Sequence, residues 1–126
     1  MRLAVTDRCN LRCNYCMPSE GIDFAKRENL LSIGELKEVG KTLSGMGIDK
    51  IRITGGEPFV RKDLMDLLRT LAGIESLKDI SVTTNATLIG PYIDELKALG
   101  ITNVNVSMDA INRDTFERIT RRDAYD

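Results

Sequence analysis

The sequence contains no histidine, and this absence excludes several kinds of catalytic site. Serine–histidine–aspartate and cysteine–histidine nucleophile pairs need an imidazole, and so do the usual ligand sets of zinc enzymes. Acid–base catalysis by imidazole is excluded for the same reason. Any chemistry must therefore be carried by cysteine, carboxylate or arginine side chains, or by a cofactor.

The chain also lacks a strong charge bias and a long hydrophobic run. Its 18 basic and 19 acidic side chains leave a net charge of -1, which implies no electrostatic attraction to nucleic acid or to an anionic membrane. No apolar stretch approaches the roughly 20 residues that span a bilayer, and the N-terminus has no signal-peptide pattern. We therefore expect a cytoplasmic protein whose partners include neither nucleic acid nor a membrane.

Cysteine is scarce but concentrated in one place. The only three cysteines are Cys9, Cys13 and Cys16, which form a C-x3-C-x2-C pattern. An odd number at this spacing is a poor disulfide framework and a good metal-ligand cluster. Three thiolates can hold three irons of a cubane cluster and leave the fourth iron open to a small molecule. A zinc site completed by a carboxylate or a partner chain, and three unrelated thiols, are the alternatives.

Four short strand patterns alternate with helical patterns along the chain. The strands are expected at residues 2–6, 50–54, 79–83 and 103–108. Ser32 and Glu35 predict a capping box at the start of the first helix, and further helices are expected at about 63–71, between Pro91 and Gly100, and from Asp114. This alternation predicts βαβ units and a parallel sheet. Residues 7–31 form a long loop that holds every cysteine, which is typical of a functional segment.

The strands are apolar in only one of their two alternation phases. Apolar residues such as Ile51 and Ile53 share one phase, whereas Arg52 and Thr54 lie in the other. Because central parallel strands are usually apolar on both faces, this pattern predicts helices on one face and a polar lumen on the other. We expect an α/β fold, a partial (β/α) barrel of about four βα units. A helix-backed sheet with one solvated face is the alternative.

With the cysteine pattern directly after the first strand, the sequence resembles the radical S-adenosylmethionine (SAM) enzymes. Further blocks narrow the resemblance: Ile51-Arg52-Ile53-Thr54-Gly55-Gly56-Glu57-Pro58, Thr83-Thr84-Asn85 and Asn105-Val106-Ser107-Met108-Asp109-Ala110. Together with residues 5–13, they resemble the GTP 3',8-cyclase family of molybdenum cofactor biosynthesis. The resemblance covers nearly the whole chain, and the blocks occur in the expected order.

The resemblance implies a role for nine residues. The ligands of a [4Fe-4S] cluster would be Cys9, Cys13 and Cys16. The contacts to SAM would come from Tyr15, Gly56 and Ser107, and the GTP-binding residues would be Arg2, Arg52 and Thr83. These last three lie in the polar strand phase, so the strand pattern and the resemblance agree. Glu57 is left with two roles, as a negative charge near SAM or as a brace for its loop.

The resemblance also implies an activity, a lyase reaction in which SAM is reductively cleaved and GTP is cyclised, with an electron donor as partner. Because the chain has fewer βα units than the family's barrel and only one cysteine triplet, we expect residues 1–126 to be a radical SAM core domain truncated at its C-terminus and inactive by itself as a cyclase. The unpaired edge after the fourth strand predicts association, including homo-oligomers. The alternatives are another radical SAM enzyme, acting in peptide or cofactor maturation, and a non-enzymatic iron–sulfur or zinc module.

Overall fold

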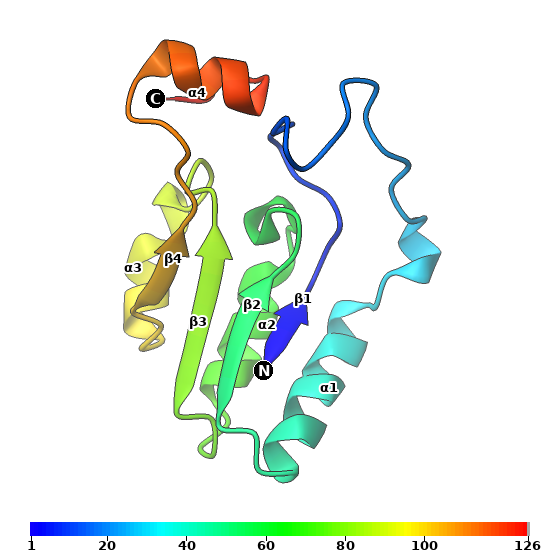
Figure 1. Cartoon of the computed structure of the whole chain (residues 1–126). Helices are drawn as coiled ribbons and strands as arrows, with labels where there is room; N and C mark the ends of the chain where they lie inside the picture. The colour runs from blue at the N-terminus through cyan, green and yellow to red at the C-terminus, as the bar shows by residue number, and fades with distance from the viewer. Residues whose placement is uncertain (126) are drawn as a thin grey trace.

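The computed structural model describes residues 1–125 and shows a single parallel sheet (Figure 1). Its strands run in the order β1-β2-β3-β4, with each strand beside its neighbour in sequence. Their bounds are β1 Arg2–Ala4, β2 Lys50–Thr54, β3 Asp79–Thr84 and β4 Asn103–Val106. The predicted βαβ architecture is confirmed. In the part of the chain that the structure describes, the sheet is open and does not close into a barrel.

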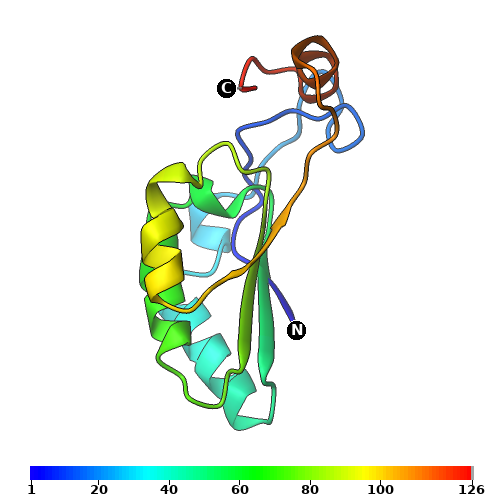
Figure 2. The ribbon, with the colours of Figure 1, turned by 90° about the vertical axis from the view of Figure 1, so that its left-hand side faces the viewer.

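The helices are arranged in two groups. Their bounds are α1 Ile33–Gly45, α2 Leu64–Ala72, α3 Ile93–Ala98 and α4 Arg113–Thr120, with short 3-10 turns η1 Arg27–Asn29, η2 Pro58–Val60 and η3 Gly90–Tyr92. Figure 2 shows α1, α2 and α3 on one face of the sheet, as the strand pattern predicted, and α4 beyond the ends of the strands. None of the helices in residues 1–125 is long and apolar enough to cross a membrane.

The capping box predicted at the start of α1 is present. The Ser32 hydroxyl accepts a hydrogen bond from the Glu35 backbone N–H at 3.2 Å, and the Glu35 carboxylate accepts one from the Ser32 N–H at 2.7 Å. Each bond satisfies a backbone donor that has no partner within the helix. The local sequence therefore determines where α1 begins.

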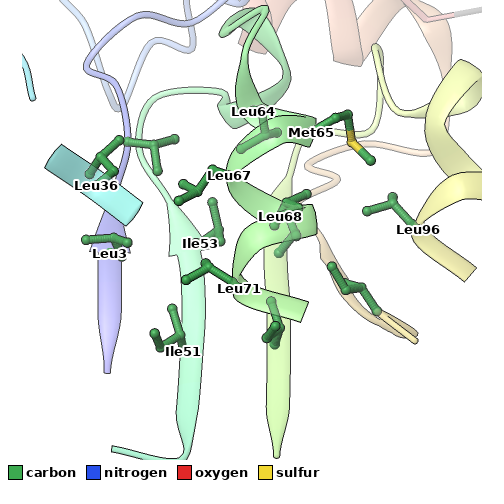
Figure 3. Close-up of a cluster of buried hydrophobic side chains, with 14 of the residues drawn as sticks. Leu3, Leu36, Ile51, Ile53, Leu64, Met65, Leu67, Leu68, Leu71 and Leu96 are labelled. Atoms are coloured by element: carbon green, nitrogen blue, oxygen red, sulfur yellow. The ribbon is translucent and has the colours of Figure 1, made fainter. Parts of the chain in front are cut away.

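The hydrophobic core lies between the sheet and its three helices (Figure 3). Ile53 and Val82 of the central strands and Leu67, Leu68 and Leu71 of α2 are completely buried. Burial of each such side chain contributes about 1.5–3 kcal/mol of hydrophobic free energy. The strand residues come from the predicted apolar phase, which confirms that the helices cover this face.

The outer strands are shorter than predicted, because regular pairing stops before the polar loops begin. After β1 the backbone bonding to the β2 side continues, first from the Val5 N–H to the Thr54 carbonyl at 3.0 Å and then from the Gly56 N–H to the Thr6 carbonyl at 2.8 Å. After β4 the Ser107 N–H donates to the Thr84 carbonyl at 2.9 Å. The residues that follow these bonds belong to the loops of the candidate site.

Candidate functional site

The cysteine loop and the predicted SAM-binding residues lie beyond the C-terminal ends of the parallel strands. The cysteine loop follows β1, the Gly55-Gly56-Glu57 segment follows β2, Asn85 follows β3, and Ser107 follows β4. The strand arrows in Figure 1 all point toward this edge, where the cysteine loop and α4 lie. Open α/β sheets bind their ligands at this edge.

The three cysteines are free thiols on one loop. Cys9 and Cys13 are half-buried and Cys16 is exposed. The Cys13 carbonyl accepts hydrogen bonds from the N–H groups of Cys16 and Met17 at 2.9 and 3.0 Å, so a tight turn joins the second and third cysteines. Burial raises the pKa of the Cys9 and Cys13 thiols above the ordinary value.

Two nitrogen donors approach the Cys9 sulfur. The Leu11 N–H lies 3.4 Å from Cys9 Sγ, and Asn85 Nδ2 lies 3.8 Å from it. N–H donors directed at sulfur are typical of metal-bound thiolates, because they offset the negative charge on the ligand. This donor arrangement fits a thiolate-ligated cluster.

The thiols do not form a ready site for a single ion. Within residues 1–125 no three histidine, cysteine or carboxylate side chains are grouped closely enough to hold one metal ion. The cysteines of a cubane cluster bind different irons and therefore lie farther apart than the ligands of one zinc ion. Three free thiols on one loop, with donors at Cys9, are compatible with a cluster, and the choice between a cluster and zinc is left to metal analysis.

The cysteine loop is fastened to α4, which comes about 100 residues later in the sequence. The Arg12 N–H donates to the Thr120 carbonyl at 2.8 Å, and the Asn14 N–H donates to the Ile119 carbonyl at 2.9 Å. Arg121, at the end of α4, donates from its guanidinium to the Met17 carbonyl at 2.9 Å. The last carbonyls of α4 have no partner within the helix, so the cysteine loop satisfies them.

The two glycines after β2 are required by close contact with the chain's own backbone. A Cβ atom on Gly56 would lie 2.2 Å from the Arg8 carbonyl oxygen, and one on Gly55, whose φ is +148°, would lie 2.5 Å from the Thr6 carbonyl oxygen. The Gly56 N–H donates to the Thr6 carbonyl at 2.8 Å. The segment leading into Cys9 is therefore what requires glycine here, and the contact of Gly56 with SAM that the resemblance implies stays a prediction.

Glu57 braces its loop, which is one of the two roles that the sequence left open; an effect of its charge on SAM stays a prediction. Its side chain is 1 % exposed. One carboxylate oxygen accepts hydrogen bonds from the Phe59 N–H at 3.1 Å and the Thr84 hydroxyl at 2.8 Å, and the other accepts one from the Asn85 N–H at 2.7 Å. Both oxygens are therefore used to connect the segments that follow β2 and β3.

Tyr15 and Ser107 are brought to the same part of the site. Tyr15 is 62 % exposed, and its hydroxyl donates to the Asp109 carboxylate at 2.5 Å. This hydrogen bond raises the pKa of Tyr15 above its ordinary value and keeps the phenol protonated. Asp109 lies two residues after Ser107, which is itself exposed. The bond therefore connects the cysteine loop to the segment that follows β4.

The predicted GTP-binding residues lie on the sheet itself, and the structure brings two of them together. Arg2 and Arg52 are register partners on β1 and β2. Both line a cavity of about 270 Å³ that also includes Lys50, Asp79 and Ser81. Thr83 is not part of that cavity lining, but its hydroxyl is buried and has no hydrogen-bond partner within the described residues.

Sequence reasoning did not find three parts of this site. Asn85 was noted only as part of a block, and the contacts of Asp109 and of the end of α4 with the cysteine loop were missed. Each of these contacts joins residues more than 70 positions apart, so no local pattern marks them. The Thr83-Thr84-Asn85 block after β3 was the one available signal.

Comparison with known proteins agrees with this geometry. Proteins named GTP 3',8-cyclase match 96 % of the chain at 52 % identity in Peptoclostridium acidaminophilum and at 45 % in Alkaliphilus oremlandii, and 97 % of it at 45 % in Moorella thermoacetica. The chain spans only 37–38 % of the length of these relatives. The family model of the radical SAM superfamily matches residues 3–126. The resemblance inferred from the sequence is confirmed, and the chain belongs to the radical SAM superfamily.

Proposed function

We propose that the chain is the SAM-binding part of a GTP 3',8-cyclase of molybdenum cofactor biosynthesis, with residues 1–126 as its radical SAM core domain. The observation that carries this proposal is the meeting of three free thiols, the Gly55-Gly56 turn and Ser107 at one edge of the sheet. The relatives named GTP 3',8-cyclase, at 45–52 % identity, support the choice of reaction.

Cys9, Cys13 and Cys16 would hold a [4Fe-4S] cluster. The sequence offers three cysteines and no histidine, so one iron would be left without a thiolate or imidazole ligand from this chain. When bound, the cluster and SAM supply one-electron cleavage of the sulfonium and a 5'-deoxyadenosyl radical. The protein contributes binding, orientation and exclusion of water.

Three residues would orient SAM. The Tyr15 ring is exposed, and its hydroxyl is anchored on Asp109, so one ring face is offered to a purine. Gly56 is held rigidly against residues 6–8, and its carbonyl would accept from the SAM amino group. The Ser107 hydroxyl, at the end of β4, would add a further polar contact.

Arg2, Arg52 and Thr83 would bind GTP on the open face of the sheet. The two guanidinium groups share one cavity with Lys50 and with one carboxylate, Asp79, and the excess of positive charge suits a triphosphate. The buried Thr83 hydroxyl has no partner among the described residues, as expected for a group that binds a ligand.

The proposal includes two partners and a location. Reductive cleavage of SAM requires an electron donor, and three free thiols suit the reducing cytoplasm.

β4 forms one edge of the sheet in the described residues, and Val106 on it is 54 % exposed. A second copy of the chain would pair with this edge strand.

The test is anaerobic reconstitution with iron and sulfide, followed by an assay of SAM cleavage with dithionite as the reductant and an assay of GTP binding. We expect 5'-deoxyadenosine from the wild-type chain and none from Cys13→Ser. Arg52→Gln should weaken GTP binding at least tenfold and leave SAM cleavage intact. Arg69→Gln, on the outer surface of α2, is the matched control and should bind GTP as the wild type does.

Two results would contradict the proposal in different ways. SAM cleavage with GTP binding that is weak and indifferent to Arg52→Gln would favour a radical SAM enzyme that acts on peptides or on another cofactor. Bound zinc, or a cluster with no SAM cleavage, would favour a non-enzymatic module.

A further inference from the structure

The side-chain amide of Asn85 has a fixed orientation. Its oxygen accepts hydrogen bonds from the Thr87 N–H at 3.1 Å and the Thr87 hydroxyl at 2.7 Å. Asn10 completes a ring of three side chains, because its amide donates to the Thr87 hydroxyl at 2.8 Å. With the oxygen committed to two donors, Asn85 Nδ2 must face the cysteine loop. It donates there to Asn10 Oδ1 at 2.9 Å and to Cys9 Sγ at 3.8 Å.

The backbone of Asn85 is fixed as well. Its N–H donates to the buried Glu57 carboxylate at 2.7 Å. The next residue, Ala86, has a φ of +67°, a left-handed conformation that an alanine adopts only when its surroundings impose it. The Ala86 N–H donates to the Thr84 hydroxyl at 3.0 Å, and that hydroxyl donates to Glu57. A strained backbone at Ala86 and the buried Glu57 carboxylate therefore both hold Asn85 in place.

We propose that Asn85 is a positioning residue of the cysteine loop, whose Nδ2 donates a hydrogen bond to Cys9 Sγ and thereby raises the reduction potential of the bound cluster. The inference rests on the proposed function, because it assumes that Cys9 is a cluster ligand. Reduction adds negative charge to a cluster and its sulfur ligands, and a donor at a ligand sulfur stabilises that charge. Asn85 also donates from its backbone N–H to Glu57, so this one residue connects the brace of the Gly55-Gly56 segment to a proposed ligand of the cluster.

The test is the midpoint potential of the reconstituted chain, measured by a redox titration that is followed by electron paramagnetic resonance. Asn85→Leu removes the donor and should shift the reduction equilibrium by roughly tenfold toward the oxidised cluster, about 59 mV more negative for one electron. Asn85→Ala also removes the Nδ2 donor, adds no charge, and should likewise shift the potential to more negative values. It serves as the second variant if Asn85→Leu does not fold.

The sign of the shift separates hydrogen bonding from simple loosening of the loop. A looser loop admits water, which stabilises the reduced cluster and moves its potential to more positive values. Asn14→Leu is the matched control, since Asn14 lies on the same loop and its side chain has no hydrogen bond to a sulfur within the described residues. This variant should keep the wild-type potential.

An unchanged or more positive potential in both Asn85 variants would overturn the inference and leave the proposed function standing. An equal negative shift in Asn14→Leu would also overturn it. Any replacement of a polar side chain by leucine near the cysteines would then lower the potential, whether or not it removed a hydrogen bond to sulfur. A wild-type chain that assembles no iron–sulfur cluster would overturn the proposed function itself, and the inference with it.

Discussion

At the scale of single residues, the site depends on contacts between segments that are distant in sequence. Gly56 shows this most clearly, because its place for a Cβ is occupied by the Arg8 carbonyl just before Cys9. The sequence predicted, by resemblance, a contact of Gly56 with SAM, and that contact stays a prediction. The sequence did not predict residues 6–8 as a partner, since a partner about 50 positions away leaves no local pattern.

Gly56→Ala should destabilise the protein by about 1–3 kcal/mol, because the new methyl group meets backbone atoms that have no room to move. The free energy of unfolding in urea measures the effect. Gly90→Ala is the control, since nothing lies within 4 Å of the position its Cβ would take. Equal stability of the two variants would show that the contact between Gly56 and Arg8 does not constrain the fold.

At the scale of elements, the sequence predicted the regular structure well and the loops poorly. The strands and helices follow from apolar periodicity, and the start of α1 follows from Ser32 and Glu35, because these signals are local. The cysteine loop has no such signal. Its N–H groups at Arg12 and Asn14 find their partners on α4, and only the folded chain brings the two together.

The contact between α4 and the cysteine loop gives a prediction about local stability. Phe116 of α4 is 6 % exposed, so Phe116→Ala should loosen the helix and release the loop. We expect the amides of Arg12 and Asn14 to exchange with solvent at least tenfold faster, which corresponds to about 1.4 kcal/mol of lost protection. Hydrogen–deuterium exchange, resolved by residue, measures this directly.

The amides of β2 and β3 should exchange in Phe116→Ala as they do in the wild type, because α4 lies outside the core between the sheet and α1–α3. Ile111→Ala, which changes a side chain that is 88 % exposed, should leave the loop amides unaffected. Unaltered exchange at Arg12 and Asn14 in Phe116→Ala would mean that α4 does not hold the loop.

At the scale of the whole molecule, the parallel sheet divides the site into two parts. The thiols and the predicted SAM-binding residues lie beyond the C-terminal ends of the strands, whereas Arg2 and Arg52 line a cavity on the sheet itself. The pairing of these arginines could be predicted, because polar positions of equal phase on neighbouring parallel strands come together. The contacts that hold the cysteine loop could not be predicted, because they come from Glu57, Asn85 and α4, which are distant from the loop in sequence.

The central proposal is that Cys9, Cys13 and Cys16 would hold a cluster and that SAM would bind at its remaining iron. The most direct test is the electron paramagnetic resonance spectrum of the reduced, reconstituted chain, recorded with and without SAM. We predict the signal of a reduced [4Fe-4S] cluster whose shape changes when SAM is added, and no such signal from Cys13→Ser. A cluster signal that is identical with and without SAM would contradict the account.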